Sequence, residues 1–177
     1  PRLPDACQNL GAALFRVGDY QAAIAAYNQA LSIQPSPLVY RNLGCALETV
    51  ALWNEARDAF ERYARLLDDD PFTLVRAAGV CPSVFEDGQA IHEFRQQLES
   101  TLLAAIDRRP TLSFAELLDR DSRPHFNVQF HGLCDRTIRE QYAQLLTPSF
   151  EHLSRPSKRE GKPSVGFYVA PGHEYAF

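Results

Sequence analysis

Residues 7–31 have the sequence CQNLGAALFRVGDYQAAIAAYNQAL, and residues 40–64 have the sequence YRNLGCALETVALWNEARDAFERYA. The two stretches align without a gap, and the shared positions recur 33 residues later in the second stretch. A fixed period of this size is typical of proteins built from one repeated supersecondary unit. This internal repeat decides the fold.

Each repeated unit is predicted to be a helical hairpin. Apolar residues at helical spacing continue to Val17 in the first unit and to Val50 in the second. The pattern pauses at the tripeptides GDY and ALW and then resumes as far as Leu31 and Leu67. Small residues allow the two helices of a hairpin to approach closely, and an aromatic residue fills the space beyond. The matching pairs are Gly11 and Gly44, Ala23 and Ala56, and Tyr27 and Phe60.

This pattern resembles the tetratricopeptide repeat, which carries Leu-Gly in its first helix and Ala, an aromatic residue, Ala and Pro in its second. The first unit fits through Ala30 and Pro35, whereas the second departs because Tyr63 replaces the small residue and Pro71 comes late. The resemblance implies two tetratricopeptide hairpins over residues 1–70. Such arrays normally need three or more units, so the exposed ends predict either further repeats or self-association of the chain.

The resemblance also implies that an extended polypeptide binds along the concave side, which the first helices line. The positions implied are Gln8, Asn9, Ala12, Phe15 and Arg16, then Arg41, Asn42, Cys45, Glu48 and Thr49. Asn9 and Asn42 both precede Leu-Gly. A carboxamide offers a donor and an acceptor together and can pair with a peptide backbone, which resembles the asparagine ladder of O-linked N-acetylglucosamine transferases. Alternatively, each Asn makes a hydrogen bond only within its own scaffold.

Residues 71–153 are predicted to be a helical spacer that packs on the repeats. A short helix ends at Cys81-Pro82, and Ser83 with Glu86 is the pattern of a capping box for the next helix. That helix carries an apolar stripe, Ile91, Phe94, Leu98, Leu102 and Ile106. The stripe is expected to pack on the second hairpin, and the alternative is that it binds a partner.

Residues 126–130 alternate between apolar and polar side chains, which predicts an extended segment. His125 and His131 flank it, and either they share a ligand or metal, or they make polar contacts with a neighbouring helix. A small hydrolase or metal enzyme that uses both histidines with Cys134 is a further alternative. The four cysteines form no paired spacing, so we expect buried thiols and no metal site.

Residues 154–177 no longer show the helical pattern of the preceding residues. Residues 154–163 form a polar, basic linker, and residues 164–177 contain the apolar run of a strand followed by a Pro-Gly turn. This order is typical of the first strand and loop of a truncated Rossmann-like α/β domain. The overall fold class expected is therefore mostly α, with one terminal strand.

The segments FNVQFHGLCDR and GFYVAPGHE, placed after the repeats, resemble the bacterial SPINDLY-like proteins related to O-linked N-acetylglucosamine transferases. The resemblance implies that the chain is the N-terminal, substrate-docking part of a protein glycosyltransferase. It places His173 where that family has an active-site histidine. A nucleotide sugar would be the cofactor of the parent enzyme, whereas this chain alone is expected to hold no cofactor and to catalyse no transfer. The alternative is a free-standing interaction scaffold of tetratricopeptide type.

Composition and charge exclude some classes of binding partner. The net charge of −4 and pI of about 5.7 leave no basic footprint for nucleic acid. No apolar run approaches the roughly 20 residues that span a bilayer. Dispersed cysteines fit a reducing cytoplasm. The chain starts with Pro and contains no Met, so we expect it to be a piece of a longer protein.

Overall fold

A computed structural model describes residues 3–120 and 126–150 of the protein. In this part of the chain every regular element is a helix and no strand is present. The elements are α1 (Leu3–Val17), α2 (Tyr20–Ile33), α3 (Pro37–Thr49), α4 (Trp53–Arg65), α5 (Pro71–Ala78), α6 (Gly88–Asp107), α7 (Phe114–Arg120), the 3₁₀ helix η1 (Phe126–His131) and α8 (Arg136–Phe150). The predicted linker and terminal strand lie outside the described residues.

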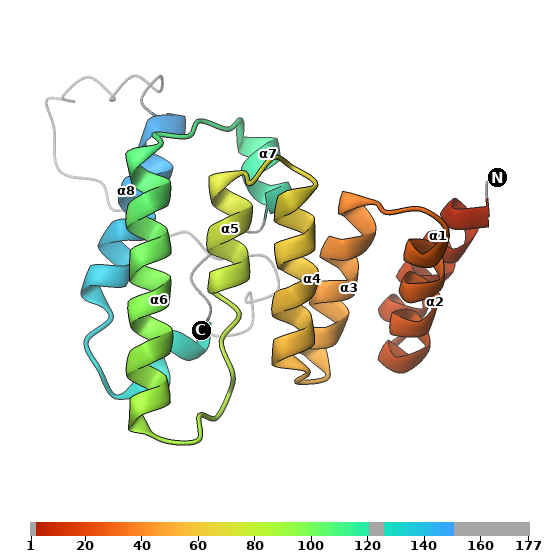
Figure 1. The fold of residues 1–177 in the computed structure, drawn as a ribbon, viewed down its shortest axis with the longest axis horizontal. Coiled ribbons are helices and arrows are strands. Elements are labelled where there is room, and N and C mark those ends of the chain that lie inside the picture. Colours follow the sequence, from red (N-terminus) through yellow and green to blue (C-terminus); the bar gives the residue numbers. More distant parts are fainter. Residues whose placement is uncertain (1–2, 121–125, 151–177) are drawn as a thin grey trace, which may run out of the picture.

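The two predicted hairpins are present. Helix α1 packs on α2 and α3 packs on α4, and α2 and α4 pack in turn on the first helix of the following hairpin. Figure 1 shows the resulting row of helices, with α1 and α2 at one end and α6 and α8 at the other. The apolar pattern pauses at the tripeptide GDY because Asp19 is the N-cap of α2. Its carboxylate accepts a hydrogen bond from the Ala22 N–H at 3.1 Å.

Each hairpin is held together by contact between a glycine and an aromatic ring. A Cβ atom built on Gly11 would lie 2.6 Å from a ring carbon of Tyr27, and one built on Gly44 would lie 2.7 Å from the ring of Phe60. Both rings are buried. Only glycine permits this approach, and the sequence pattern of small and aromatic residues therefore has the packing role that was predicted for it.

Helices α5 and α6 form a third hairpin. It lies within residues 71–153, the region that was predicted to be a helical spacer. Its first helix begins at Pro71, in register with Pro4 and Pro37, and we call these three the repeat prolines. Its second helix carries Ala90 and Phe94, which follow Ala56 and Phe60 by 34 residues. Helix α5 lies between α4 and α6 in the row (Figure 1). Three stacked hairpins therefore lie within the described residues 3–120.

The third hairpin differs from the others because its first helix is short. Helix α5 ends at Ala78, and Pro82 follows in the region that a longer helix would occupy. Helix α6 then begins at Gly88, with the Asp87 carboxylate accepting from the Ala90 N–H at 2.8 Å. The predicted capping box at Ser83 and Glu86 is therefore wrong, since the cap residue is Asp87.

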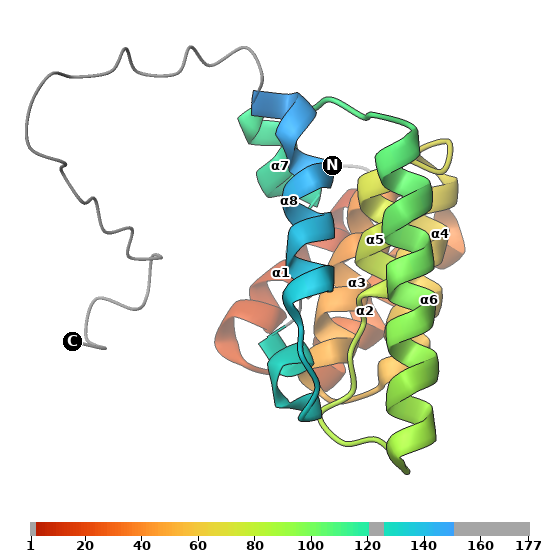
Figure 2. The same ribbon diagram turned by 90° about the vertical axis from the view of Figure 1, so that its left-hand side faces the viewer.

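A second core lies beyond the repeated one. Phe94, Leu98 and Leu102 of α6 are buried together with α5 and α8 side chains, among them Ile138 and Leu145. Figure 2 shows α8 running alongside α6. The apolar stripe of α6 thus packs on α5 and α8, and it is α5 that covers the second hairpin. This differs from the expected direct packing of the stripe on that hairpin.

The predicted extended segment at residues 126–130 is wrong, because the chain forms the 3₁₀ helix η1 there. Val128 is buried in the second core, whereas Phe130 is 68% exposed, so the two do not share one face of a strand. The Asn127 side chain donates to the Cys81 carbonyl at 3.2 Å. Five alternating residues were too short a pattern to distinguish a strand from a turn held by side-chain contacts.

Candidate peptide-binding face

Three side chains share one register along the array. Asn9, Asn42 and Arg76 each lie five residues after the repeat proline of their hairpin. Residues in the same register of stacked hairpins lie on the same side of the array. These residues therefore form a row across α1, α3 and α5, which we call the polar row.

The first two members of the polar row have free carboxamides. Asn9 is exposed and Asn42 is half-buried. Neither side chain makes a hydrogen bond within the described part of the chain. Each carboxamide can therefore offer its donor and its acceptor to another molecule. The alternative role for these residues, a hydrogen bond within the scaffold, is not made to any of residues 3–120 or 126–150.

The other predicted residues on α1 and α3 surround these two carboxamides. Phe15 is half-buried, and its ring packs edge-on against Tyr20 with centroids 5.3 Å apart. Gln8 and Arg41 are half-buried and Arg16 is exposed. Apart from Phe15, which reaches Tyr20 of α2, these side chains lie on the side of α1 and α3 that carries Asn9 and Asn42. We call this surface of α1 and α3 the first-helix face.

Arg76, the third member of the polar row, is bound within the chain. Its guanidinium donates from Nη1 to Oε1 of Glu48 at 3.0 Å, and Nη2 pairs with Oε2. The side chains of Arg76 and Glu48 are only 8% and 13% exposed. The guanidinium carbon also lies 3.9 Å from the centre of the Phe60 ring. Glu48, which was predicted to bind peptide, pairs with Arg76 in this structure.

The chain itself covers the corresponding face of the third hairpin. Val75 and Gly79 occupy the register of Arg41 and Cys45, counted from their repeat prolines. Val75 is fully buried in the second core, which includes residues of α8. A Cβ built on Gly79 would lie 3.2 Å from the hydroxyl of Tyr142 in α8. The first-helix face is thus open over two hairpins and closed by α8 at the third.

Comparison with known protein families gives a match for the first hairpin. Residues 4–37 match the tetratricopeptide repeat. The match runs from one repeat proline to the next, so it spans α1, α2 and the loop into α3. A tetratricopeptide repeat indicates a role in protein–protein interaction. No curated protein matches the chain, and the resemblance to SPINDLY-like transferases receives no support from these comparisons.

A cysteine–histidine contact that sequence spacing did not reveal lies beside the stacked hairpins. The Cys81 sulfur is 3.4 Å from Nε2 of His131, and the imidazole packs edge-on against Phe85 and Phe94. Burial raises the pKa of the Cys81 thiol to about 12. Burial, with a smaller effect of the Arg95 charge, lowers the pKa of His131. Both groups are therefore neutral near pH 7, and they do not form the thiolate–imidazolium pair of a cysteine nucleophile.

This contact has a structural role, since it ties η1 to the segment that follows α5. His131 thus makes a polar contact, but with Cys81 in the segment after α5 and not with a neighbouring helix as in one of the predicted alternatives. His125 lies outside the described residues. No group of three possible metal ligands occurs among the residues that the structure describes. The predicted burial of all four cysteines is wrong, because Cys134 is exposed and Cys45 is half-buried.

The cysteines should differ strongly in reactivity. We expect a thiol reagent at pH 8 to modify Cys134 at least about 100-fold faster than Cys81, because the buried Cys81 thiol is neutral and becomes accessible only on opening. Labelling followed by digestion and mass spectrometry measures both rates in one sample. The Cys134→Ser variant should lack the fast modification at this position. Equal rates for Cys81 and Cys134 would contradict the packing described above.

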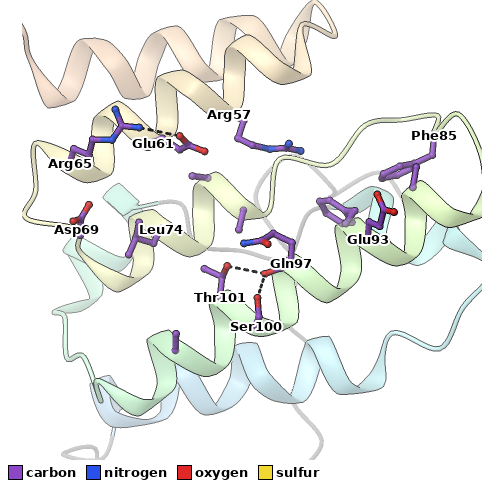
Figure 3. A pocket seen from close by; sticks show the side chains of 15 residues that line it. Arg57, Glu61, Arg65, Asp69, Leu74, Phe85, Glu93, Gln97, Ser100 and Thr101 are labelled. Carbon is purple, nitrogen blue, oxygen red and sulfur yellow. Dashed lines mark hydrogen bonds and ion pairs between the residues drawn. The ribbon is translucent and has the colours of Figure 1, made fainter.

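Grooves also occur on the side formed by the second helices. The larger, of about 970 Å³, lies between α4 and α6 with α5 as its floor (Figure 3). Its rim carries Arg57, Glu61 and Arg65, of which the last two form an ion pair at 3.2 Å. A groove of about 790 Å³ occupies the equivalent place between α2 and α4. Because the grooves recur with the hairpins, they reflect the stacking of second helices, and we assign them no function.

None of the helices in the described ranges is both long enough and apolar enough to cross a bilayer. The predicted catalytic residue, His173, lies outside these ranges.

Proposed function

We propose that the first-helix face binds an extended segment of another protein. The carboxamides of Asn9 and Asn42 would each accept from a backbone N–H of this segment and donate to a backbone carbonyl. The observation that carries the proposal is the pair of unbonded carboxamides in one register of two stacked hairpins. Backbone pairing makes recognition tolerant of the side chains in the bound segment.

We further propose that the bound segment ends before α5. The segment would cross α1 and α3, where the first-helix face is open. It would stop before α5, because the Arg76–Glu48 pair and α8 fill the next position. The proposed contact therefore spans two hairpins, and additional affinity would come from side chains such as Phe15 and Arg16 at its edge.

Replacing both asparagines tests this proposal. The double variant Asn9→Ala, Asn42→Ala should fold normally but bind extended peptides roughly tenfold to a few tens-fold more weakly, since the loss of each carboxamide costs about 1 kcal/mol net. The probe is a fluorescein-labelled, unstructured peptide selected by display on the wild-type chain. Fluorescence anisotropy gives the dissociation constants, and circular dichroism checks that the fold is retained.

The matched control is the double variant Asn28→Ala, Asn54→Ala. These asparagines are exposed, and they lie on the second helices α2 and α4, away from the first-helix face. The control should bind the same peptide with unchanged affinity. If the Asn9 and Asn42 variant also kept wild-type affinity, the backbone-pairing role would be excluded.

A finer proposal concerns the parent protein. The resemblance to SPINDLY-like proteins supports a role for the face in docking protein substrates of a cytoplasmic glycosyltransferase. In that proposal a nucleotide sugar is the donor and His173 lies at the active site. The alternative is a free-standing scaffold without a catalytic domain. Sequencing the gene downstream of the Phe177 codon distinguishes them, because two further α/β domains are expected only for the transferase.

A further inference from the structure

Helix α1 carries an apolar stripe that no part of the described chain covers. The stripe consists of Leu3, Ala6, Leu10, Ala13 and Val17. Leu3, Leu10 and Val17 are 63%, 53% and 77% exposed. The spacing of three and four residues places all five on one side of the helix. The stripe forms the outer surface of the first hairpin, at the end of the row in Figure 1.

The repeat shows what this surface is shaped to receive. Counted from the repeat prolines, Leu10 and Ala13 of α1 correspond to Leu43 and Ala46 of α3. Leu43 and Ala46 are buried, 6% and 0% exposed, in the core where α3 packs on α2. At these two central positions the stripe on α1 therefore has the same residues as a surface that receives a second helix one hairpin later.

The third hairpin repeats this arrangement. Ala77 and Val80 stand in the register of Leu10 and Ala13, and both are buried in the core that includes α4. Two interfaces of the same kind thus already exist in the molecule, α2 with α3 and α4 with α5. The exposed stripe on α1 is the equivalent surface of the first hairpin, one hairpin before the α2–α3 interface.

We infer that this stripe is a docking surface for the second helix of another tetratricopeptide hairpin, stacked on α1 as α2 is stacked on α3. The occupant is a helix whose apolar side resembles that of α2, with alanines that admit Leu10 and Val17 between them. The inference does not depend on peptide binding, which uses a different side of α1.

A second copy of this chain does not supply such a helix. In the described part of the chain each second helix is already covered, α2 by α3, α4 by α5 and α6 by α8. Head-to-tail stacking of two copies is therefore blocked at the α8 end. The covering hairpin must come from another polypeptide segment.

Duplicating the first hairpin tests the inference in the full chain. A second copy of residues 4–36 is joined directly ahead of Pro4, which reproduces the natural Ser36–Pro37 junction. The added α2 should then cover the original α1. We expect the melting temperature to rise by about 5 °C and the exchange of the original α1 amides to slow by about tenfold.

The substitution Leu10→Glu in the original α1 separates stacking from other effects. In the extended chain it should remove most of the gain, whereas in the unextended chain, where Leu10 is exposed, it should shift the melting temperature by less than about 2 °C. An extended chain with no gain in melting temperature would overturn the inference. So would sedimentation of the unextended chain as a dimer that Leu10→Glu dissociates, because a second copy would then be the occupant.

Discussion

The Glu48→Ala variant is expected to lose about 3 kcal/mol of unfolding free energy, because it removes the carboxylate that pairs with the buried Arg76 guanidinium. Arg76 is only 8% exposed and lies against the Phe60 ring, so water cannot replace the carboxylate without opening the packing around the guanidinium. Urea unfolding followed by circular dichroism at 222 nm measures the change.

Two further variants make this test specific. Glu61→Ala removes an exposed carboxylate paired with Arg65 on the surface of α4 and should cost less than about 0.5 kcal/mol. Adding Arg76→Leu to Glu48→Ala should restore part of the lost stability, since no lone charge remains buried. A loss below about 1 kcal/mol for Glu48→Ala would mean that the pair is solvated and that Glu48 is available to a peptide after all.

The Gly44→Leu variant is expected to destabilise the second hairpin by about 3 kcal/mol or more, because overpacking a tight core forces helices apart. Even a methyl group at this position would lie 2.7 Å from the ring of Phe60, which is itself fully buried. The same ring supports the Arg76 guanidinium, so displacing it should also disturb the ion pair. Thermal and urea unfolding measure the loss.

Gly88 provides the matched control. It lies in the first turn of α6, and a Cβ there would meet nothing within 4 Å. Gly88→Ala should therefore leave stability unchanged or raise it by about 0.5 kcal/mol through helix propensity. A stable, fully folded Gly44→Leu protein would contradict the close packing that defines the repeated hairpin.

The repeat allowed the first two hairpins to be predicted, because their determinants are local. Gly11 with Tyr27 and Gly44 with Phe60 carry the geometry in residue types, and the helical period fixes which side of each helix is buried. The positions of Asn9 and Asn42 followed from the same register. Local chemistry of this kind can be deduced without knowing what the rest of the chain does.

The third hairpin could have been found from Pro71, Ala90 and Phe94, but two features obscured it. Pro82 shortens its first helix, and Arg76 replaces the asparagine of the polar row. The pairing of Arg76 with Glu48 depends on recognising that hairpin. The covering of α5 by α8 could not be predicted, since it joins residues far apart in sequence whose apolar patterns would fit several partners.

The covering of α5 by α8 has a consequence for how the chain folds. Contacts within and between the hairpins join near neighbours in sequence, so this half has a low contact order and can grow unit by unit. Bringing α8 back to the α5 side chains of the second core instead closes a long loop through α6, α7 and η1, at an entropic cost that is met before its contacts form. This closure should be the slow step of folding. In a nascent chain the hairpins would therefore be ordered before α8 packs against Phe72 and Val75.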